Sequence, residues 1–397
     1  MGMRITTNMT MSTYRYNLMQ STNRWANAQN KVLTHRNFNS YAEDPAAATH
    51  AWRIRRSITE TGTHYDNNND TLARFRIAYS AMEGIKTGIA DKIAKASSIT
   101  GNSDTTASAR QELAGVIRNA ADSVIQSING AKLGDHFVFA GKDALNVPFS
   151  WSEDGKTLYY RGVNVAAGSV ERPTSTDPWA GIPDTDKDEY GVPAAAKDPA
   201  QLANMTANEK AWAAYYKDQG DVARLKAMSE EETNSDIGLG LQEADDGSII
   251  NGSTFNMALP GINMLGGYGL DADGDPKNLA LLMKKYADVL ERADDATGQW
   301  SKEDRAEADR LLNKITKNND EIISAFASDI SGEVEFLETN KDRLKDQHDA
   351  LNLELVNLED VDPADAITDL LYNYTCYNAA LKVGTQLLSQ SLIDYMN

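Results

Sequence analysis

The 397-residue chain has little cysteine, a shortage of positive charge and no long apolar run. Its one cysteine, Cys376, excludes a disulfide within the chain and any metal site built on several cysteines. No run of 18 apolar residues occurs, so we expect no insertion into a membrane. Lys and Arg number 39 against 58 Asp and Glu, a net charge of -19. That balance disfavours nucleic acid as a partner, because phosphate neutralisation drives such binding.

Signals for export and for catalysis are missing as well. Arg4, Arg15 and Arg24 are spread through the N-terminal segment and no apolar stretch follows, so we expect no cleaved signal peptide. By this rule alone the protein looks cytosolic, unless its export uses a signal that is not cleaved. The five histidines are scattered, and neither a phosphate-binding glycine loop nor a Gly-x-Ser-x-Gly motif occurs. We therefore expect no catalytic, cofactor-binding or metal-binding residues, and no enzyme.

One segment comes near to a metal site. Residues 271–276, Asp-Ala-Asp-Gly-Asp-Pro, begin like a calcium loop, which needs clustered oxygen ligands. Pro276 stands where such a loop needs glycine, and Leu282 stands where it needs a bidentate glutamate. A polar turn that leads into a helix is the favoured interpretation.

The sequence does contain an amphipathic segment at its C-terminal end, 363–397. Asp362 and Pro363 are the expected cap and first position of a helix. Its apolar residues recur at alternating steps of three and four, the a/d pattern of a coiled coil. They are Ile367, Leu371, Tyr374, Leu381, Leu388, Leu392 and Tyr395. A single helix with one apolar stripe needs a partner, from this chain or from a neighbouring subunit.

The N-terminal segment repeats this spacing with Met11, Tyr14, Leu18, Trp25, Ala28 and Val32. Two such helices at opposite ends of a chain most simply pair with each other as a coiled coil. The spacing does not decide between a pair within one chain and a surface on which subunits assemble. The residues that we expect at an assembly interface are Leu18, Trp25, Val32, Leu371, Leu381, Leu388 and Leu392.

Two breaks separate these ends from the rest of the chain. At the first, Asp44 is expected to cap a helix that begins at Pro45. At the second, Asp362 and Pro363 follow a long helical pattern. We expect both breaks to act as hinges.

Between the hinges, helical patterns joined by short loops predict a bundle. After Gly134, residues 136–141 and 157–162 read as strands, with a hairpin turn at 152–156. Residues 204–228 read as a helix. The expected fold class is mainly α with an inserted α+β or β domain. Its predicted parts are a terminal coiled coil (1–42 with 363–397), a helical bundle rod (43–135 with 276–362) and a variable central domain (136–275).

Three stretches carry a resemblance to the flagellin family: 3–9 (Met-Arg-Ile-Thr-Thr-Asn-Met), 43–48 (Glu-Asp-Pro-Ala-Ala-Ala) and 389–396 (Ser-Gln-Ser-Leu-Ile-Asp-Tyr-Met). The first stretch and Phe-Val-Phe-Ala-Gly at 137–141 are more similar to the hook-associated junction subunits of that family, which adjoin the filament, than to flagellin itself. The resemblance covers roughly residues 3–141 and 277–397.

This resemblance implies a tubular homo-oligomer with the terminal helices at its inner core and the inserted domain facing outward. It implies another hook-associated protein on the hook side, flagellin on the filament side, and a cytoplasmic export chaperone at the C-terminal helix. It also implies type III export with an uncleaved signal, and hence an extracellular place in the bacterial flagellum. The implied function is a structural subunit that joins hook to filament. A filament-forming flagellin, or an enzyme or adhesin with its activity in 136–275, are the alternatives.

Overall fold

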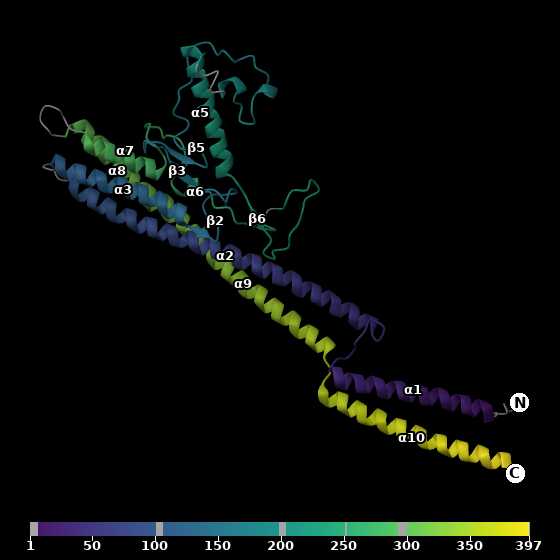
Figure 1. The fold of residues 1–397 in the computed structure, drawn as a ribbon. Helices are drawn as coiled ribbons and strands as arrows, with labels where there is room; N and C mark the ends of the chain where they lie inside the picture. Colours follow the sequence, from purple (N-terminus) through teal and green to yellow (C-terminus); the bar gives the residue numbers. More distant parts are fainter. Residues whose placement is uncertain (1–6, 101–105, 198–203, 251, 293–299, 397) are drawn as a thin grey trace. The chain divides into compact units, whose positions relative to one another are not determined.

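The computed structural model describes residues 7–100, 106–197, 204–250, 252–292 and 300–396, with backbone alone for 7–8, 99–100 and 387–396. The chain is mainly helical (Figure 1), as the sequence predicted. It falls into two compact units, which we call the terminal unit (1–64 with 342–397) and the central unit (65–341). The three-part division expected from the sequence stays a prediction. In the described parts, no helix combines the length and the apolar character needed to cross a bilayer.

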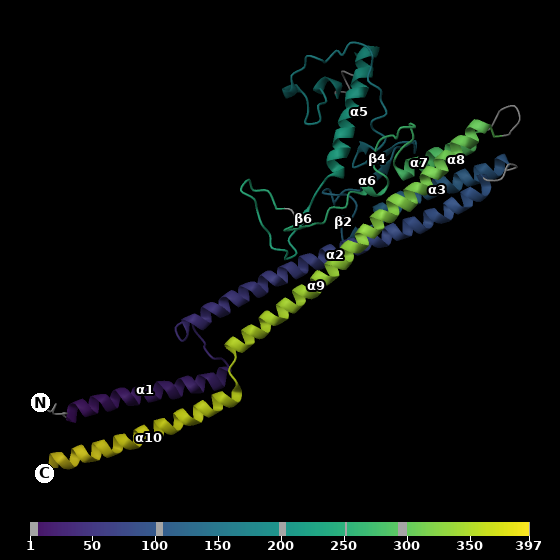
Figure 2. The same ribbon diagram turned by 180° about the vertical axis from the view of Figure 1, so that it is seen from behind.

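The terminal unit is built on two helices from opposite ends of the chain, α1 (Thr7–Thr34) and α10 (Pro363–Met396). They lie side by side and run in opposite directions (Figures 1 and 2), which confirms the expected pairing. The unit also contains the first part of α2 (Pro45–Thr100) and the last part of α9 (Ser324–Glu359).

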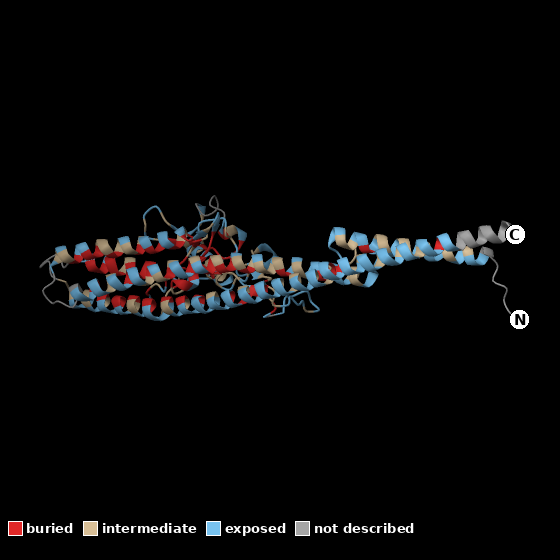
Figure 3. Cartoon of the chain, turned by 90° about the horizontal axis from the view of Figure 1, so that it is seen from below, coloured by how far each residue is buried: buried red, intermediate tan, exposed pale blue. Residues whose placement is uncertain are grey.

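The central unit is a bundle of long helices around one apolar core. Besides α2 and α9 it contains α3 (Ala107–Gly130), α7 (Leu279–Glu291) and α8 (Lys302–Lys317). Buried side chains line the inner faces of these helices (Figure 3). On α2, Ala78 takes the core position between Phe75 and Met82, and the neighbouring Tyr79 is 38% exposed.

The helix that follows Ser301 has one irregular segment. Ser301 caps α8 by accepting the backbone N–H of Asp304. The helix then passes through a π-helical segment, η3 (Asn318–Ile323), directly into α9. The side chain of Asn318 donates to the carbonyl of Lys277 at 3.2 Å. This bond ties the irregular segment to the loop that precedes α7.

Three small antiparallel sheets lie beside the bundle. Their strands are β1 (Lys132–Leu133) with β2 (His136–Phe137), β3 (Phe149–Trp151) with β4 (Leu158–Tyr160) and β5 (Val163–Asn164), and β6 (Asn234–Ser235) with β7 (Phe255–Asn256). Trp151 pairs with Leu158, which confirms the expected hairpin. The strand expected over 136–141 is shorter, because Val138 and Phe139 form a buried turn and Ala140 makes an isolated bridge to Pro260.

The remaining helix of good length is α5 (Ala207–Ser229), close to the helix expected over 204–228. Thr206 and Glu209 form a capping box at its start, in which each side chain bonds the other residue's backbone N–H. A small second core packs around this helix, formed by Trp179, Val192, Ala196, Trp212 and Ala213. Short helical turns occur at η1 (Asp184–Asp186), η2 (Ala194–Ala196) and α6 (Gly261–Met264).

Candidate assembly surface on the terminal helices

Aromatic contacts set the alignment of α1 and α10. Trp25 stacks on Tyr377 with 5.5 Å between ring centroids and 9° between ring planes. It also lies 6.3 Å from the ring of Tyr374. Farther along, the Tyr14 ring occupies the space where a Cβ on Gly384 would stand. As residue numbers fall along α1 they rise along α10, as an antiparallel pair requires.

On α1, the residues that face this partner are the ones the sequence predicted. Leu18, Trp25 and Val32 are each half-buried, and Ala28 between them is buried. The a/d spacing of α1 therefore does describe a helix-helix seam. Whether these side chains also contact other subunits stays a prediction.

On α10, the seam toward α1 is not the apolar stripe of the sequence pattern. Over 363–386, where its side chains are described, the residues that are not exposed recur at steps of four and three. They are Ala366, Leu370, Asn373, Tyr377, Ala380 and Gly384. Each member of the predicted stripe over these residues lies one position later. Small residues let the two backbones approach, so the intramolecular seam uses the less apolar face.

The predicted stripe is left open to solvent. Leu371 is 61% exposed and Leu381 is 39% exposed, and Ile367 and Tyr374 are exposed as well. Leu388 and Leu392 lie on the part of α10 whose side chains are outside the described residues. The sequence left open which partner covers this stripe. Trp25 of α1 lies beside Tyr374, but the described stripe residues remain 39–61% exposed, so α1 leaves most of the stripe uncovered.

The terminal unit as a whole has almost no core. Its buried apolar residues, among the described side chains, are Ala28, Ala51, Ile54, Leu344 and Ala366. Its exposed large apolar residues are Met9, Tyr16, Met19, Leu33, Tyr41, Trp52, Leu353, Val356, Ile367, Leu371, Tyr372, Tyr374, Leu381 and Val383. Figure 3 shows pale blue and tan over most of α1 and α10. Exposed apolar surface of this extent marks an interaction site.

Charge is also nearly absent from these helices. From Leu370 to Ile393 the single charged residue is Lys382, and α1 carries three, Arg15, Arg24 and Lys31. A helix that lacks a charged face is suited to burial on several sides. The surface of α1 and α10 thus resembles the interior of an assembly more than the outside of a monomer.

The predicted hinge residues occupy helix starts. The Asp44 carboxylate accepts the backbone N–H groups of Ala46 (3.1 Å) and Ala47 (2.9 Å), and α2 begins at Pro45. The Asp362 carboxylate accepts the N–H of Ala364 at 2.8 Å, and α10 begins at Pro363. Both expected caps are confirmed, and the hinge motion stays a prediction.

The two connecting segments are also bound to each other, which the sequence did not indicate. Asn37 donates its backbone N–H to the carbonyl of Glu359 at 2.7 Å, and its side chain donates to the carbonyls of Asp360 (2.9 Å) and Leu358 (3.3 Å). The N–H of Val361 donates to the carbonyl of His35 at 3.1 Å. We call this set of bonds the clip. It caps the C-terminal end of α9 with the side chain of a residue more than 300 positions away.

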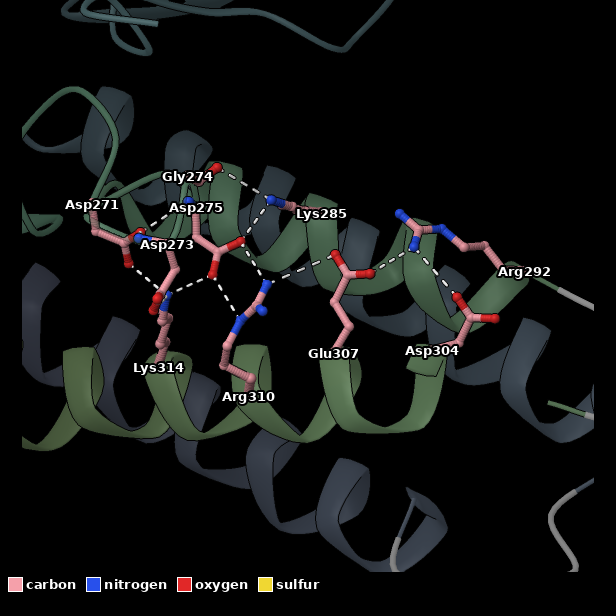
Figure 4. A network of polar contacts seen from close by, with 10 residues as sticks. All are labelled: Asp271, Asp273, Gly274, Asp275, Lys285, Arg292, Asp304, Glu307, Arg310 and Lys314. Carbon is pink, nitrogen blue, oxygen red and sulfur yellow. Dashed lines mark hydrogen bonds and ion pairs between the residues drawn. The ribbon is translucent and has the colours of Figure 1, made fainter. Parts of the chain in front are cut away.

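The acidic segment 271–276 forms the polar turn that the sequence favoured. Oxygen atoms of Asp271, Asp273 and Asp275 lie close enough to hold a cation. The Lys314 ammonium occupies this position, 2.6, 2.7 and 2.5 Å from the three carboxylates (Figure 4). Lys285 also donates to Asp275 at 2.6 Å. The turn is thereby fastened to α7 and α8 by protein cations.

Asp275 is the buried centre of this network. Its burial alone would raise the pKa of its carboxyl group, but hydrogen bonds from Lys285 and Lys314 outweigh that effect and lower the pKa to about 2. Arg310 adds a further contact, with its Nε atom 3.1 Å from the carboxylate. The network stabilises the central unit at neutral pH and leaves these carboxylates neutralised by protein cations.

Comparison with known proteins bears on the N-terminal third of the chain. Residues 5–143, which include α1, α2, α3 and the first small sheet, match the family model described as the bacterial flagellin N-terminal helical region. The match shows that these residues are similar to the N-terminal helical region of bacterial flagellins. No curated protein matches the sequence closely.

The fold of the chain is similar to that of a solved structure. That structure is described as a flagellar hook-associated protein from Vibrio parahaemolyticus. Its comparison with the present chain gives a TM-score of 0.50 and 11% sequence identity. The match covers 80% of the present chain and 100% of the other. At this identity the likeness concerns the fold.

Proposed function

We propose that the chain is a structural subunit of the flagellin family, and that it joins the hook to the filament of the bacterial flagellum. Copies of the chain assemble through α1 and α10, with Leu18, Trp25 and Val32 on one helix and the apolar stripe on the other. The observation that carries the proposal is the exposure of Leu371 and Leu381 on a helix whose own intramolecular seam uses a different face.

The energy available from the stripe favours contact with several neighbours. Complete burial of one large apolar side chain contributes roughly 1.5–3 kcal/mol. Four half-exposed stripe residues therefore offer about 3–6 kcal/mol, while association costs on the order of 4–15 kcal/mol. A single pairwise contact is marginal on these values. A closed array, in which each copy meets more than one neighbour, multiplies the buried area and suits a tubular structure.

The partners follow from the proposed place in the flagellum. Another hook-associated protein lies on the hook side and flagellin on the filament side. Before export, a cytoplasmic chaperone covers α10, whose exposed apolar surface needs shielding. Type III export then brings the chain outside the cell without a cleaved signal. The similarity in fold to a protein described as hook-associated supports the hook side of this proposal.

Electron microscopy of a strain that lacks the gene tests the proposal. We expect hooks without filaments, flagellin in the medium, and filaments restored by a plasmid copy. Filaments that still grow in the deletion strain would overturn the junction function. Long filaments formed by the purified protein alone would favour the alternative, a filament-forming flagellin. An adhesin is a third possibility, for which the described residues provide no specific site.

A further inference from the structure

A narrow hairpin extends from the β6–β7 ladder of the central unit (Figure 2). We call its residues 238–250 the arm. Within it, the N–H of Ile250 donates to the carbonyl of Gln242 at 2.9 Å, and the N–H of Ala244 donates to the carbonyl of Ser248 at 2.8 Å. These bonds give the arm a defined backbone up to its turn.

The base of the arm is fastened to α2 and α9. Asn67 of α2 donates to the carbonyl of Asp236, and Asn340 of α9 donates to the carbonyl of Ile237, both at 2.9 Å. The Phe255 ring packs against Phe75 at 5.3 Å and Phe336 at 6.0 Å between centroids. A fixed base presents the arm in one orientation, which lowers the entropy cost of docking it.

The outer part of the arm combines apolar and acidic side chains. Leu241, Ile249 and Ile250 are 49%, 40% and 42% exposed. Glu243, Asp245 and Asp246 lie among them, and no Lys or Arg occurs from 227 to 252. Burial of the three apolar side chains requires a partner with apolar surface and without negative charge.

A groove that has an apolar surface and no acidic lining residue lies between α2 and α3. Two adjoining cavities of about 310 and 610 Å³ share Gly84 and Ser127 in their lining. Ile85, Ile89 and Val124 give the groove an apolar floor, and its edges are mostly small residues. A Cβ on Gly84 or Gly88 would meet no atom within 4 Å, so this space is open.

The charge of the groove is opposite to that of the arm. Its charged lining residues are Arg76 and Lys92, and none of the lining residues is acidic. Arg76 forms an ion pair with Glu338 of α9 at 2.6 Å, so Lys92 supplies the positive charge that can attract an acidic segment. In a chain with a net charge of -19, two copies repel each other over most of their surfaces. The groove is a place where an acidic segment of another copy meets favourable charge and apolar surface together.

We propose that the arm of one copy docks in the α2–α3 groove of a neighbouring copy. Leu241, Ile249 or Ile250 contact the apolar floor, while the arm carboxylates face Lys92. The surfaces are different on the two partners, so the contact is head-to-tail and propagates around a ring of copies. This inference rests on the proposed assembly into the flagellum.

Disulfide crosslinking in assembled flagella tests the docking. A chain with Cys376→Ser, Ile249→Cys and Ser123→Cys is expressed in the deletion strain, and its flagella are isolated and oxidised. We expect a ladder of crosslinked species on a non-reducing gel, and single-cysteine chains that give no ladder. Protein that is present in flagella but stays monomeric on the gel overturns the docking. Absence of the protein from flagella overturns the proposed function, and the docking with it.

A groove-filling variant separates docking from folding. Gly88→Leu places a side chain in the open space of the groove and raises helix propensity, so the fold is retained. We expect it to abolish the crosslinked ladder. Gly62→Leu makes the same change on α2 at a position that does not line the groove and is also free of neighbours within 4 Å, and we expect it to keep the ladder. A ladder that persists in Gly88→Leu contradicts the proposal.

Discussion

Single residues determine how closely the segments of the central unit can approach one another. Gly266 has a φ of +93°, in the left-handed region that favours glycine. A Cβ at this position would lie 2.5 Å from the carbonyl oxygen of Lys277. This glycine therefore permits the close approach between the loop before α7 and the π-helical segment.

Gly266→Ala tests that approach. We expect the free energy of unfolding of the chain to fall by about 2–4 kcal/mol, because backbone strain and a clash with a backbone atom add together. Urea unfolding followed by circular dichroism measures the change. Gly88→Ala, in open space on α2, is the matched control and should be neutral or gain up to about 1 kcal/mol. Equal free energies of unfolding for the two variants would show that an alanine at position 266 causes no strain.

Asp275 gives the central unit an acid-sensitive component. Its pKa in the folded chain is about 2, against an ordinary value of 3.8. A depressed carboxyl pKa stabilises the fold above the unfolded value and loses that contribution as pH falls from about 4 to about 2. The difference corresponds to about 2 kcal/mol.

Asp275→Asn should therefore lower the free energy of unfolding by at least about 2 kcal/mol at neutral pH and flatten its dependence on pH between 4 and 2. Chemical unfolding at a series of pH values measures both effects. Asp273→Asn is the control, since its side chain is 57% exposed and has one partner in the network, and it should keep most of the pH dependence. A slope in Asp275→Asn equal to that of the unchanged chain would refute the assignment.

Local signals at the residue scale were readable in the sequence, and distant partners were not. Asp44 and Asp362 cap helices that start next to them, so composition and spacing predicted them. The acidic turn was also predicted. Its partner Lys314 lies 39–43 residues away in the sequence, and no rule of sequence spacing predicts that this side chain meets these carboxylates.

At the scale of elements, α10 shows what periodicity can and cannot predict. The a/d rule found the strongest apolar stripe, which includes Leu371 and Leu381. The seam with α1 uses Ala366, Ala380 and Gly384, whose small size matters more than their hydrophobicity. A pattern of apolar residues finds surface that needs burial, but it does not say whether the cover comes from the same chain. On α1 the predicted stripe coincides with residues of reduced exposure, and their role in assembly stays a prediction.

The clip joins the two connections of the terminal unit into one element. Asn37→Ala removes two side-chain hydrogen bonds to carbonyls at the end of α9. We expect faster hydrogen exchange of the Val361 amide, because its bond to His35 depends on the same pairing. Asn39→Ala, at an exposed neighbouring position, should leave this exchange rate unchanged. Unaltered exchange in Asn37→Ala would mean that the backbone bonds alone hold the clip.

At the scale of the whole molecule, the two units differ in how they obtain stability. The central unit buries a continuous core that extends from Leu72 to Leu337 in the sequence. The terminal unit buries mainly small side chains and exposes many large apolar ones.

The sequence predicted the mainly helical fold class from helical periodicity. The sequence did not predict the arm, because the three apolar residues of the arm are scattered among glycine and acidic residues and show no periodicity.

The central claim is that the exposed stripe of α10 is an assembly surface. Leu371→Ser/Leu381→Ser removes two of its side chains, and their exposure means that the fold loses little stability. Leu145→Ser/Val147→Ser makes a comparable change at exposed residues of the central unit. Each variant is expressed in the deletion strain, and its amount in isolated flagella is compared with its amount in the medium. We predict that the α10 variant keeps its helical circular dichroism but is found in the medium, without filaments, while the control enters flagella. An α10 variant that enters flagella as well as the control contradicts the account.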